Sequence, residues 1–251
     1  MPKPSKFFRP QNISDPGYFG KDELSRSEEN LGSYNSDLVA RFYAKLEIRE
    51  TSQNERILEF GAGSGTLAQI FQSKFGILPE CVELDRELLQ VLREKGFKSF
   101  QSLSESTWGY SGIYTSNVLE HIPDDISTLK EMFAAMKNDS KLVVYVPAFP
   151  ILFTDMDLEV GHVRRYRKSE LVDKISNAGF VVVSAEYSDS LGFLATLLVK
   201  FLGYQSKIGN LGNAKSLKFY DQYLYPLSRF IDKAGFKRII GKNLIIEARR
   251  P

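Results

Sequence analysis

The chain has 251 residues, of which 43% are hydrophobic and 25% charged, and its formal net charge is +2. This length suits one large domain or one domain with an appendage, and so small a net charge gives no general attraction to nucleic acid, which we exclude as a partner. The sequence contains no run of about 18 apolar residues and no signal-peptide pattern, and its single cysteine, Cys81, fits a reducing compartment. We therefore expect a cytoplasmic protein.

The first periodic segment lies between residues 22 and 46. Leu38, Phe42 and Leu46 recur four positions apart, which is the spacing of one face of a helix. We expect a helix here that covers one face of the fold.

A short apolar strand, a glycine-rich turn and a helix follow from residue 57 onward. The turn reads E-F-G-A-G-S-G-T over residues 59–66, with Gly61, Gly63 and Gly65 at alternate positions. Glycines let the backbone turn sharply and approach a ligand, at which the new helix points its free N–H groups. A P-loop is excluded because no lysine follows, and a dinucleotide motif needs glycine where Thr66 stands. A tight turn that binds nothing remains open.

The pattern E-x-G-x-G-x-G over residues 59–65 resembles the first motif of class I methyltransferases that use S-adenosylmethionine. This resemblance implies that the three glycines contact the cofactor, that Glu59 suits its cationic methionine end, and that S-adenosylhomocysteine is the product. In many members of the class, a segment ahead of the first strand lies over the cofactor. Tyr34 is our candidate for that role, and a helix that merely caps the sheet is the alternative.

An acidic residue, Glu83, ends the second predicted strand, 22 positions after Gly61. A carboxylate at this spacing accepts hydrogen bonds from both ribose hydroxyls of a nucleoside cofactor. The run E-L-D-R-E-L-L from Glu83 lies over the D-x-S-P-E-x-L run of the family, which assigns the ribose to Glu83 and places Leu84 beside it. The alternative is a carboxylate that stabilises the start of the next helix.

Two further turns resemble cofactor-binding turns of the family. The turn after the third predicted strand meets the adenine in the family, and here it carries Leu103 and Ser104 but no aspartate. The run N-V-L-E-H-I over residues 117–122 resembles the motif after the fourth strand, so Asn117 and Val118 are expected to line the methionine moiety through backbone groups.

The two histidines of the chain, His121 and His162, are candidate general bases, because an unperturbed imidazole titrates near neutral pH. For His121 the alternative is structural, since it lies in the loop before a predicted helix and can anchor that loop.

The segment after the fifth predicted strand, P-A-F-P-I-L-F-T over residues 147–154, is too rich in proline to continue a strand. Open α/β sheets bind ligands at the carboxyl ends of their strands, so we expect Phe149 and Phe153 to wall an acceptor pocket. Acidic residues alternate over 155–159 ahead of His162. We interpret them as a solvated acidic loop and predict no metal, because their spacing matches no known closed site.

Residues 161–171 read G-H-V-R-R-Y-R-K-S-E-L. They resemble a sub-family of bacterial methyltransferases, similar to types 11 and 12, in which H-x-R-R-Y closes this loop. Arg164, Arg165 and Tyr166 are then candidates for recognising an anionic or polar group of the acceptor. The alternative, that these side chains tie the loop to the protein's own carboxylates, remains open.

Roughly 55 residues separate the last two predicted strands, far more than a hairpin needs. Residues 191–202 are apolar but too short to span a bilayer, and residues 217–231 repeat as an amphipathic helix interrupted at Pro226. Eight cations and two acids lie between residues 191 and 240. We expect either a packing cap or a lid for an amphiphilic, anionic acceptor such as a lipid- or phosphate-linked sugar, with peripheral membrane contact as part of the second case.

The resemblance implies an α/β fold with a doubly wound, seven-stranded, mostly parallel sheet, a Rossmann-like methyltransferase fold whose seventh strand is antiparallel. The predicted strands cover residues 57–60, 80–84, 98–101, 112–116, 141–146, 180–187 and 244–248. The expected parts are an N-terminal extension with a cap helix (1–45), the cofactor-binding core (46–187), the helical insertion (188–242) and the last core strand (243–251).

The expected reaction is in-line transfer of a methyl group from S-adenosylmethionine to a small-molecule or lipid-linked acceptor. Two alternatives remain: an NAD-type oxidoreductase on a similar sheet, and a cofactor-binding regulatory protein without turnover. The sequence does not indicate an oligomeric state.

Overall fold

The structure, a computed structural model, describes residues 30–48, 55–202 and 214–251. The first part of the predicted N-terminal helix, residues 22–29, lies outside the described residues, as does most of the N-terminal extension. Among the described residues, none of the helices is both long enough and apolar enough to cross a membrane.

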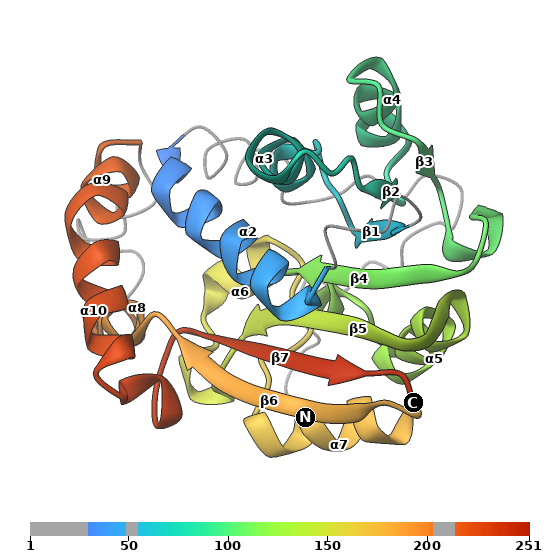
Figure 1. Cartoon of the computed structure of the whole chain (residues 1–251). Coiled ribbons are helices and arrows are strands. Elements are labelled where there is room, and N and C mark those ends of the chain that lie inside the picture. The colour runs from blue at the N-terminus through green and yellow to red at the C-terminus, as the bar shows by residue number, and fades with distance from the viewer. Residues whose placement is uncertain (1–29, 49–54, 203–213) are drawn as a thin grey trace, which may run out of the picture.

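A seven-stranded sheet forms the centre of the molecule (Figure 1), with strand order β3-β2-β1-β4-β5-β7-β6. Its strands are β1 (Ile57–Phe60), β2 (Glu80–Val82), β3 (Ser99–Phe100), β4 (Tyr110–Ser116), β5 (Met136–Pro147), β6 (Val181–Ser188) and β7 (Asn243–Arg249). β7 runs antiparallel to both of its neighbours, and the other six strands are parallel to one another. The predicted Rossmann-like methyltransferase fold is confirmed.

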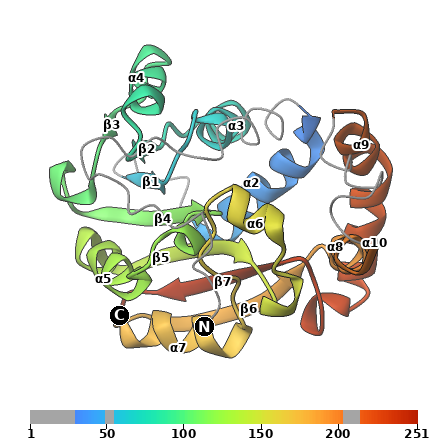
Figure 2. The same cartoon turned by 180° about the vertical axis from the view of Figure 1, so that it is seen from behind.

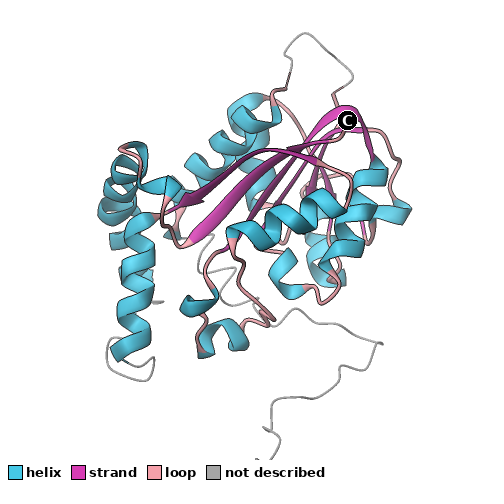
Figure 3. Cartoon of the chain, turned by 90° about the horizontal axis from the view of Figure 1, so that it is seen from below, coloured by secondary structure: helices cyan, strands magenta, loops and turns pink. Residues whose placement is uncertain are grey.

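Helices cover both faces of the sheet (Figure 3), because side chains along each strand point alternately to the two faces. The helices that flank the sheet are α2 (Gly32–Leu46), α3 (Thr66–Phe75), α4 (Arg86–Glu94), α5 (Asp125–Ala135) and α7 (Lys168–Asn177). Val143 and Tyr145 of β5 pack against α2 and α3 on one face, whereas Leu142 and Val144 pack against α5 and α7 on the other. A strand buried on both faces reads as a continuous apolar run, which is why β5 was recognisable in the sequence.

The segment after β5 is more ordered than the predicted loop. It forms the 3₁₀ turn η3 (Pro150–Leu152) and the short helix α6 (Asp155–Glu159). Asp157 reaches back to accept the backbone N–H of Thr154 at 2.8 Å, which satisfies a donor at the start of α6. Asp157 therefore stabilises the start of a helix, and the interpretation of this segment as a loop misses that role.

The helical insertion consists of α8 (Ser190–Leu202), α9 (Ala214–Phe219), the π-helical turn η5 (Tyr220–Leu224), α10 (Tyr225–Lys233) and the 3₁₀ turn η6 (Phe236–Arg238). Pro226 lies at the start of α10, and the wider π turn directly before it accommodates a residue that has no N–H to donate. The predicted interruption therefore takes the form of a π turn within a continuous helical stretch. Figures 1 and 2 both show α8 and α10 at the end of the sheet toward which β4 and β6 point.

Buried carboxylates attach this insertion to the core. Asp221 of η5 accepts the backbone N–H groups of Ser33 at 2.9 Å and Tyr34 at 2.7 Å, both at the start of α2. Within the insertion, Asp232 of α10 accepts the N–H of Ser190, at the start of α8, at 3.2 Å and so joins these two helices. Free N–H groups and the helix dipole favour a negative charge at a helix start. The first turn of α2 therefore depends on a residue of the insertion.

We predict that Asp221→Ala lowers the free energy of unfolding by about 1–2 kcal/mol, the usual cost of losing a helix cap. Urea denaturation measures this. Gln222→Ala, at the exposed neighbouring position, is the matched control and should be neutral within about 0.5 kcal/mol. Equal losses in the two variants would contradict the capping role of Asp221.

Candidate functional site

The glycine turn joins β1 to α3 at the carboxyl edge of the sheet. Gly61, Gly63 and Gly65 have φ values of +75°, +55° and +85°, a region in which residues with a Cβ are strained. A Cβ on Gly61 would lie 2.3 Å from Cγ2 of Val118, which follows β4. Glycine is therefore needed for the close contact between these two segments, both of which the sequence assigned to the cofactor.

Glu83 lies directly after β2, and its carboxylate faces the glycine turn. Its Oε2 accepts the N–H of Gly63 at 2.8 Å, and its Oε1 accepts the N–H of Asp85 at 2.9 Å. Burial raises the pKa of Glu83 above its ordinary value, whereas these two backbone hydrogen bonds lower it. An ionised carboxylate has about four lone-pair sites, so Glu83 can still accept a hydrogen bond from a ligand. Its role at the ribose of the cofactor stays a prediction.

Asp85, two positions after Glu83, has a separate role. Its carboxylate accepts the N–H groups of Glu87 at 2.9 Å and Leu88 at 3.1 Å and so caps α4. Glu59 is buried beneath the glycine turn, where Tyr114 Oη donates a hydrogen bond to its Oε2 at 3.0 Å.

The remaining predicted cofactor residues divide into exposed and buried positions. Leu84, Ser104 and Asn117 are exposed, and Asn117 has a φ of +53°, which sets the course of the loop after β4. Leu103 is buried, and its side chain packs in the core on the side of α5. Leu103 can therefore offer its backbone, but not its side chain, to an adenine.

Tyr34, the residue expected to lie over the cofactor, contacts side chains of the sheet and of the insertion. Its hydroxyl lies 2.6 Å from the hydroxyl of Tyr145 on β5 and accepts a hydrogen bond from Asn243 Nδ2 at 3.3 Å. Its ring packs against Tyr225 of α10, with centroids 4.7 Å apart. These contacts match the alternative interpretation, in which α2 caps the sheet, and they extend it to the insertion.

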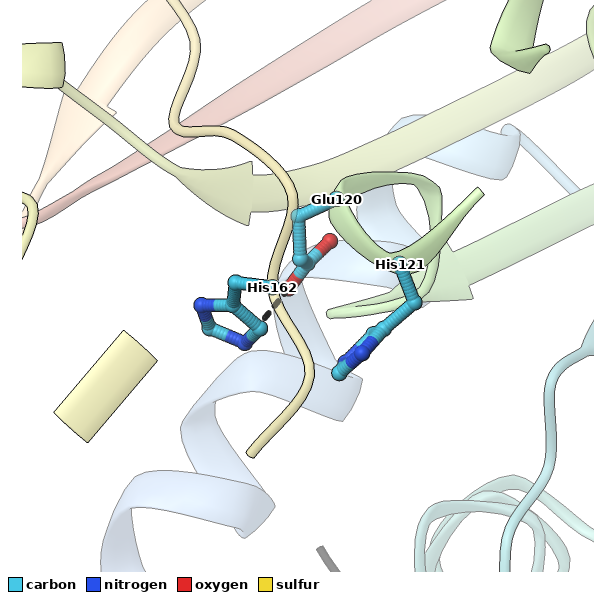
Figure 4. A group of neighbouring side chains, drawn as sticks. All are labelled: Glu120, His121 and His162. Atoms are coloured by element: carbon cyan, nitrogen blue, oxygen red, sulfur yellow. Dashed lines mark ion pairs between the residues drawn. The ribbon is translucent and has the colours of Figure 1, made fainter. Parts of the chain in front are cut away.

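His121 and His162 come together although 41 positions separate them (Figure 4). Their ring centroids are 4.7 Å apart at an interplanar angle of 76°. Burial and the neighbouring His162 lower the pKa of His121 to about 4, so its imidazole is uncharged at neutral pH. Beside them lies Glu120, which is 0% exposed, and burial raises its pKa to about 8. The sequence reasoning named both histidines but missed Glu120, whose position inside an apolar run was the available signal.

The basic loop before α7 binds the protein's own carboxylates. Arg164 Nη1 donates to Asp125 at 2.6 Å, and Arg165 donates to both oxygens of Asp157 at 2.8 and 3.1 Å. Tyr166 is fully buried and donates to Asp125 at 2.7 Å. The second interpretation of this loop therefore holds for its described contacts. The expectation of a solvated acidic loop is wrong for Asp157, which is 2% exposed and whose carboxylate is satisfied by Arg165, His162 and the N–H of Thr154 instead of water.

Aromatic residues connect the segment after β5 to the insertion. Phe149 stacks on Tyr187 with centroids 4.6 Å apart and meets Phe193 of α8 at 5.1 Å. The carbonyl of Phe153 accepts a hydrogen bond from Lys200 of α8 at 3.1 Å. Phe149 and Phe153 thus lie where the carboxyl edge of the sheet adjoins α8.

A sequence profile for a methyltransferase domain matches residues 27–185, and the chain belongs to this family. Its fold and cofactor are accordingly those of a class I methyltransferase that uses S-adenosylmethionine. The oxidoreductase alternative is therefore wrong. No curated protein matches the sequence significantly.

Solved structures of methyltransferases share the fold. A methyltransferase dependent on S-adenosylmethionine from Archaeoglobus fulgidus superposes with a TM-score of 0.59 at 16% identity, covering 90% of this chain and 98% of that one. Geranyl diphosphate C-methyltransferase from Streptomyces coelicolor gives a TM-score of 0.58 at 12% identity, covering 95% and 86%. Phosphoethanolamine N-methyltransferase 2 from Haemonchus contortus gives 0.54 at 16% identity, covering 97% of this chain and 61% of that one.

We predict that Glu83→Ala weakens S-adenosylhomocysteine binding by about 1.5–3 kcal/mol, the range for hydrogen bonds to a charged group. Isothermal titration calorimetry measures the change. Glu94→Ala, which removes an exposed carboxylate from the far end of α4, is the matched control and should bind normally. Unchanged affinity in Glu83→Ala would remove Glu83 from the cofactor site.

We also predict that Asp125→Asn destabilises the fold in a pH-dependent way. Burial alone would raise the pKa of Asp125, but hydrogen bonds from Lys174 and Tyr166 outweigh it and hold the pKa below its ordinary value. Asp125 then contributes stability that is present above about pH 4 and lost as the pH falls through its folded-state pKa. The variant should lose about 2 kcal/mol at pH 7, and less below pH 4.

Urea denaturation at several pH values tests this prediction. Glu131→Gln, an exposed carboxylate on the same helix, is the control. A deficit that stays constant down to pH 3 would mean that the charge of Asp125 is not what stabilises the loop before α7.

Proposed function

We propose that the chain methylates a small amphiphilic acceptor that combines an apolar body with an anionic group. The cofactor supplies a methyl group on a sulfonium, which is already reactive. The protein's contribution is then to align the acceptor for in-line attack and to exclude water. The acceptor would lie between the carboxyl edge of the sheet and the insertion, in contact with Phe149 and Phe153.

The observation that carries this proposal is an exposed apolar face on α8. Leu194, Leu198 and Phe201 recur four and three positions apart, on one face of the helix, and are 52%, 57% and 78% exposed. A helix that served only as a packing cap would bury its apolar residues against the sheet. Exposed large apolar residues grouped on one face usually mark a binding surface.

Positive charge lies in the same insertion. Lys215 and Lys218 of α9 are exposed, and their ammonium groups would attract an anionic group of the acceptor. Two of the solved structures with this fold carry names that refer to geranyl diphosphate and phosphoethanolamine, and both of those compounds bear phosphate groups. The fold therefore accommodates anionic acceptors.

We further propose that residues 188–242 act as the lid of the acceptor pocket. Tyr225 Oη donates to Asp37 of α2 at 2.7 Å, and Lys200 binds the segment after β5. The insertion thus bridges the two segments that border the carboxyl edge. Removal of a proton from the acceptor, where its nucleophile carries one, is assigned to the cluster of Glu120, His121 and His162.

A transfer assay with labelled cofactor tests the proposed function. The protein is incubated with methyl-labelled S-adenosylmethionine and one of two fractions from the cells that produce it, either the lipid extract or the water-soluble small molecules. We expect label in an acidic, solvent-extractable product. Label only in water-soluble products would contradict the amphiphilic acceptor, and a protein that binds S-adenosylhomocysteine without labelling either fraction would be a regulatory protein without turnover.

We predict that the protein co-sediments with phosphatidylglycerol vesicles at low salt and is released at about 0.5 M salt, where surface charges are screened. The double substitutions Leu194→Ser with Leu198→Ser, and Lys215→Glu with Lys218→Glu, should each lower the bound fraction about threefold or more. Leu78→Ser, at an exposed leucine outside the insertion, is the control. Absence of binding at low salt would contradict a membrane-presented acceptor.

A further inference from the structure

The only two histidines of the chain meet at a buried carboxylate (Figure 4). Glu120 and His121 belong to the 3₁₀ turn η2 (Leu119–His121) after β4, and His162 follows α6. One side-chain atom from each of the three residues lies within 4.8 Å of the others. Each of these atoms is of a type that binds metal ions.

Glu120 lacks the partners that a buried carboxylate normally has. It is 0% exposed, and neither of its oxygens accepts a hydrogen bond from any other described residue. The Nε2 atom of His162 is 3.8 Å from Oε1, too far for a hydrogen bond. A buried carboxylate without donors is costly, so the position favours a ligand that compensates it.

The residues around the cluster hold the rings in place. The Nδ1 atom of His162 lies 2.8 Å from Asp157 Oδ1, and Arg165 fixes Asp157 through two hydrogen bonds. A carboxylate bound to one ring nitrogen fixes the tautomer that leaves the other nitrogen free to bind a metal. His121 in turn forms a hydrogen bond to the backbone of Gly161. Both rings are therefore oriented by the protein.

We propose that Glu120, His121 and His162 bind a divalent first-row transition ion such as Zn²⁺. Two imidazoles and one carboxylate form the ligand set of open zinc sites and of the facial triad of iron enzymes, whereas all-oxygen sets suit Mg²⁺ and Ca²⁺. Two ligand atoms on one tetrahedral zinc ion lie about 3.4 Å apart. Binding would therefore draw the three ligand atoms, which lie within 4.8 Å of one another, closer together.

This site differs from the one that the sequence analysis rejected, which consisted of the alternating acids of residues 155–159 and His162. The alternating acids of α6 are not the ligands: Asp157 bonds the Nδ1 atom of His162, and the other two proposed ligands, Glu120 and His121, come from η2. Three protein ligands leave coordination positions open, where an acceptor oxygen would lose its proton more readily. That last role rests on the proposed function, but metal binding does not.

Cobalt binding to the tag-free, chelator-treated protein tests the proposal, because Co²⁺ reports its ligands through visible absorption bands. We expect about one Co²⁺ per chain, displaced by Zn²⁺ and not by Mg²⁺ at equal concentration. Glu120→Gln and His162→Gln should each weaken binding at least about tenfold. Glu159→Gln, an exposed carboxylate on α6, should bind like the parent protein.

A second measurement needs no variant. Since the chain has two histidines, ¹⁵N spectra of histidine-labelled protein contain two imidazoles, and Zn²⁺ should shift one ring nitrogen of each. Unshifted imidazoles, or equal cobalt affinity in Glu120→Gln, would overturn the proposal. Binding of S-adenosylhomocysteine to the chelator-treated protein is measured in parallel. Normal cofactor binding without metal binding would contradict the metal site and leave the proposed function untouched.

Discussion

Burying a carboxylate is costly unless hydrogen-bond donors or a cation replace its water, and this constraint governs the carboxyl edge of the sheet. Asp125 accepts hydrogen bonds from Arg164, Tyr166 and Lys174, and thereby joins the loop before α7 to the start of α5. Asp157 does the same for α6 through Arg165 and His162. The partners of Asp125 are distant from it in sequence, whereas those of Asp157 lie within eight residues, and both carboxylates fix loops that the sheet alone does not.

The features that the sequence predicted correctly are those that depend on neighbouring residues. Local patterns are visible in sequence: the alternate glycines from Gly61, the acidic residue Glu83 after the second strand, and the apolar run of β5. They yielded the sheet and the cofactor turn because backbone conformation and strand burial depend on neighbouring residues. Strand ends were less accurate; β2 ends at Val82, before the predicted end, because pairing with β3 is short.

Long-range pairing was not visible in the sequence. Nothing near Arg164 shows that its partner is Asp125, and nothing near Tyr34 shows that its hydroxyl lies beside that of Tyr145. The cluster around Glu120 is of the same kind, since its members belong to two loops that only the fold brings together. Side chains at the candidate site were therefore predictable where they act with the local backbone, and not where they act in pairs across the sheet.

The position of β7 has a consequence for the order of folding. β7 lies between β5 and β6 and pairs with both, although both precede it in the chain. During synthesis, β5 and β6 each present an unpaired edge until the residues up to Arg249 have left the ribosome, and unpaired edges are templates for association with other chains. The sheet of this half of the domain therefore closes in a non-local step that comes late in folding.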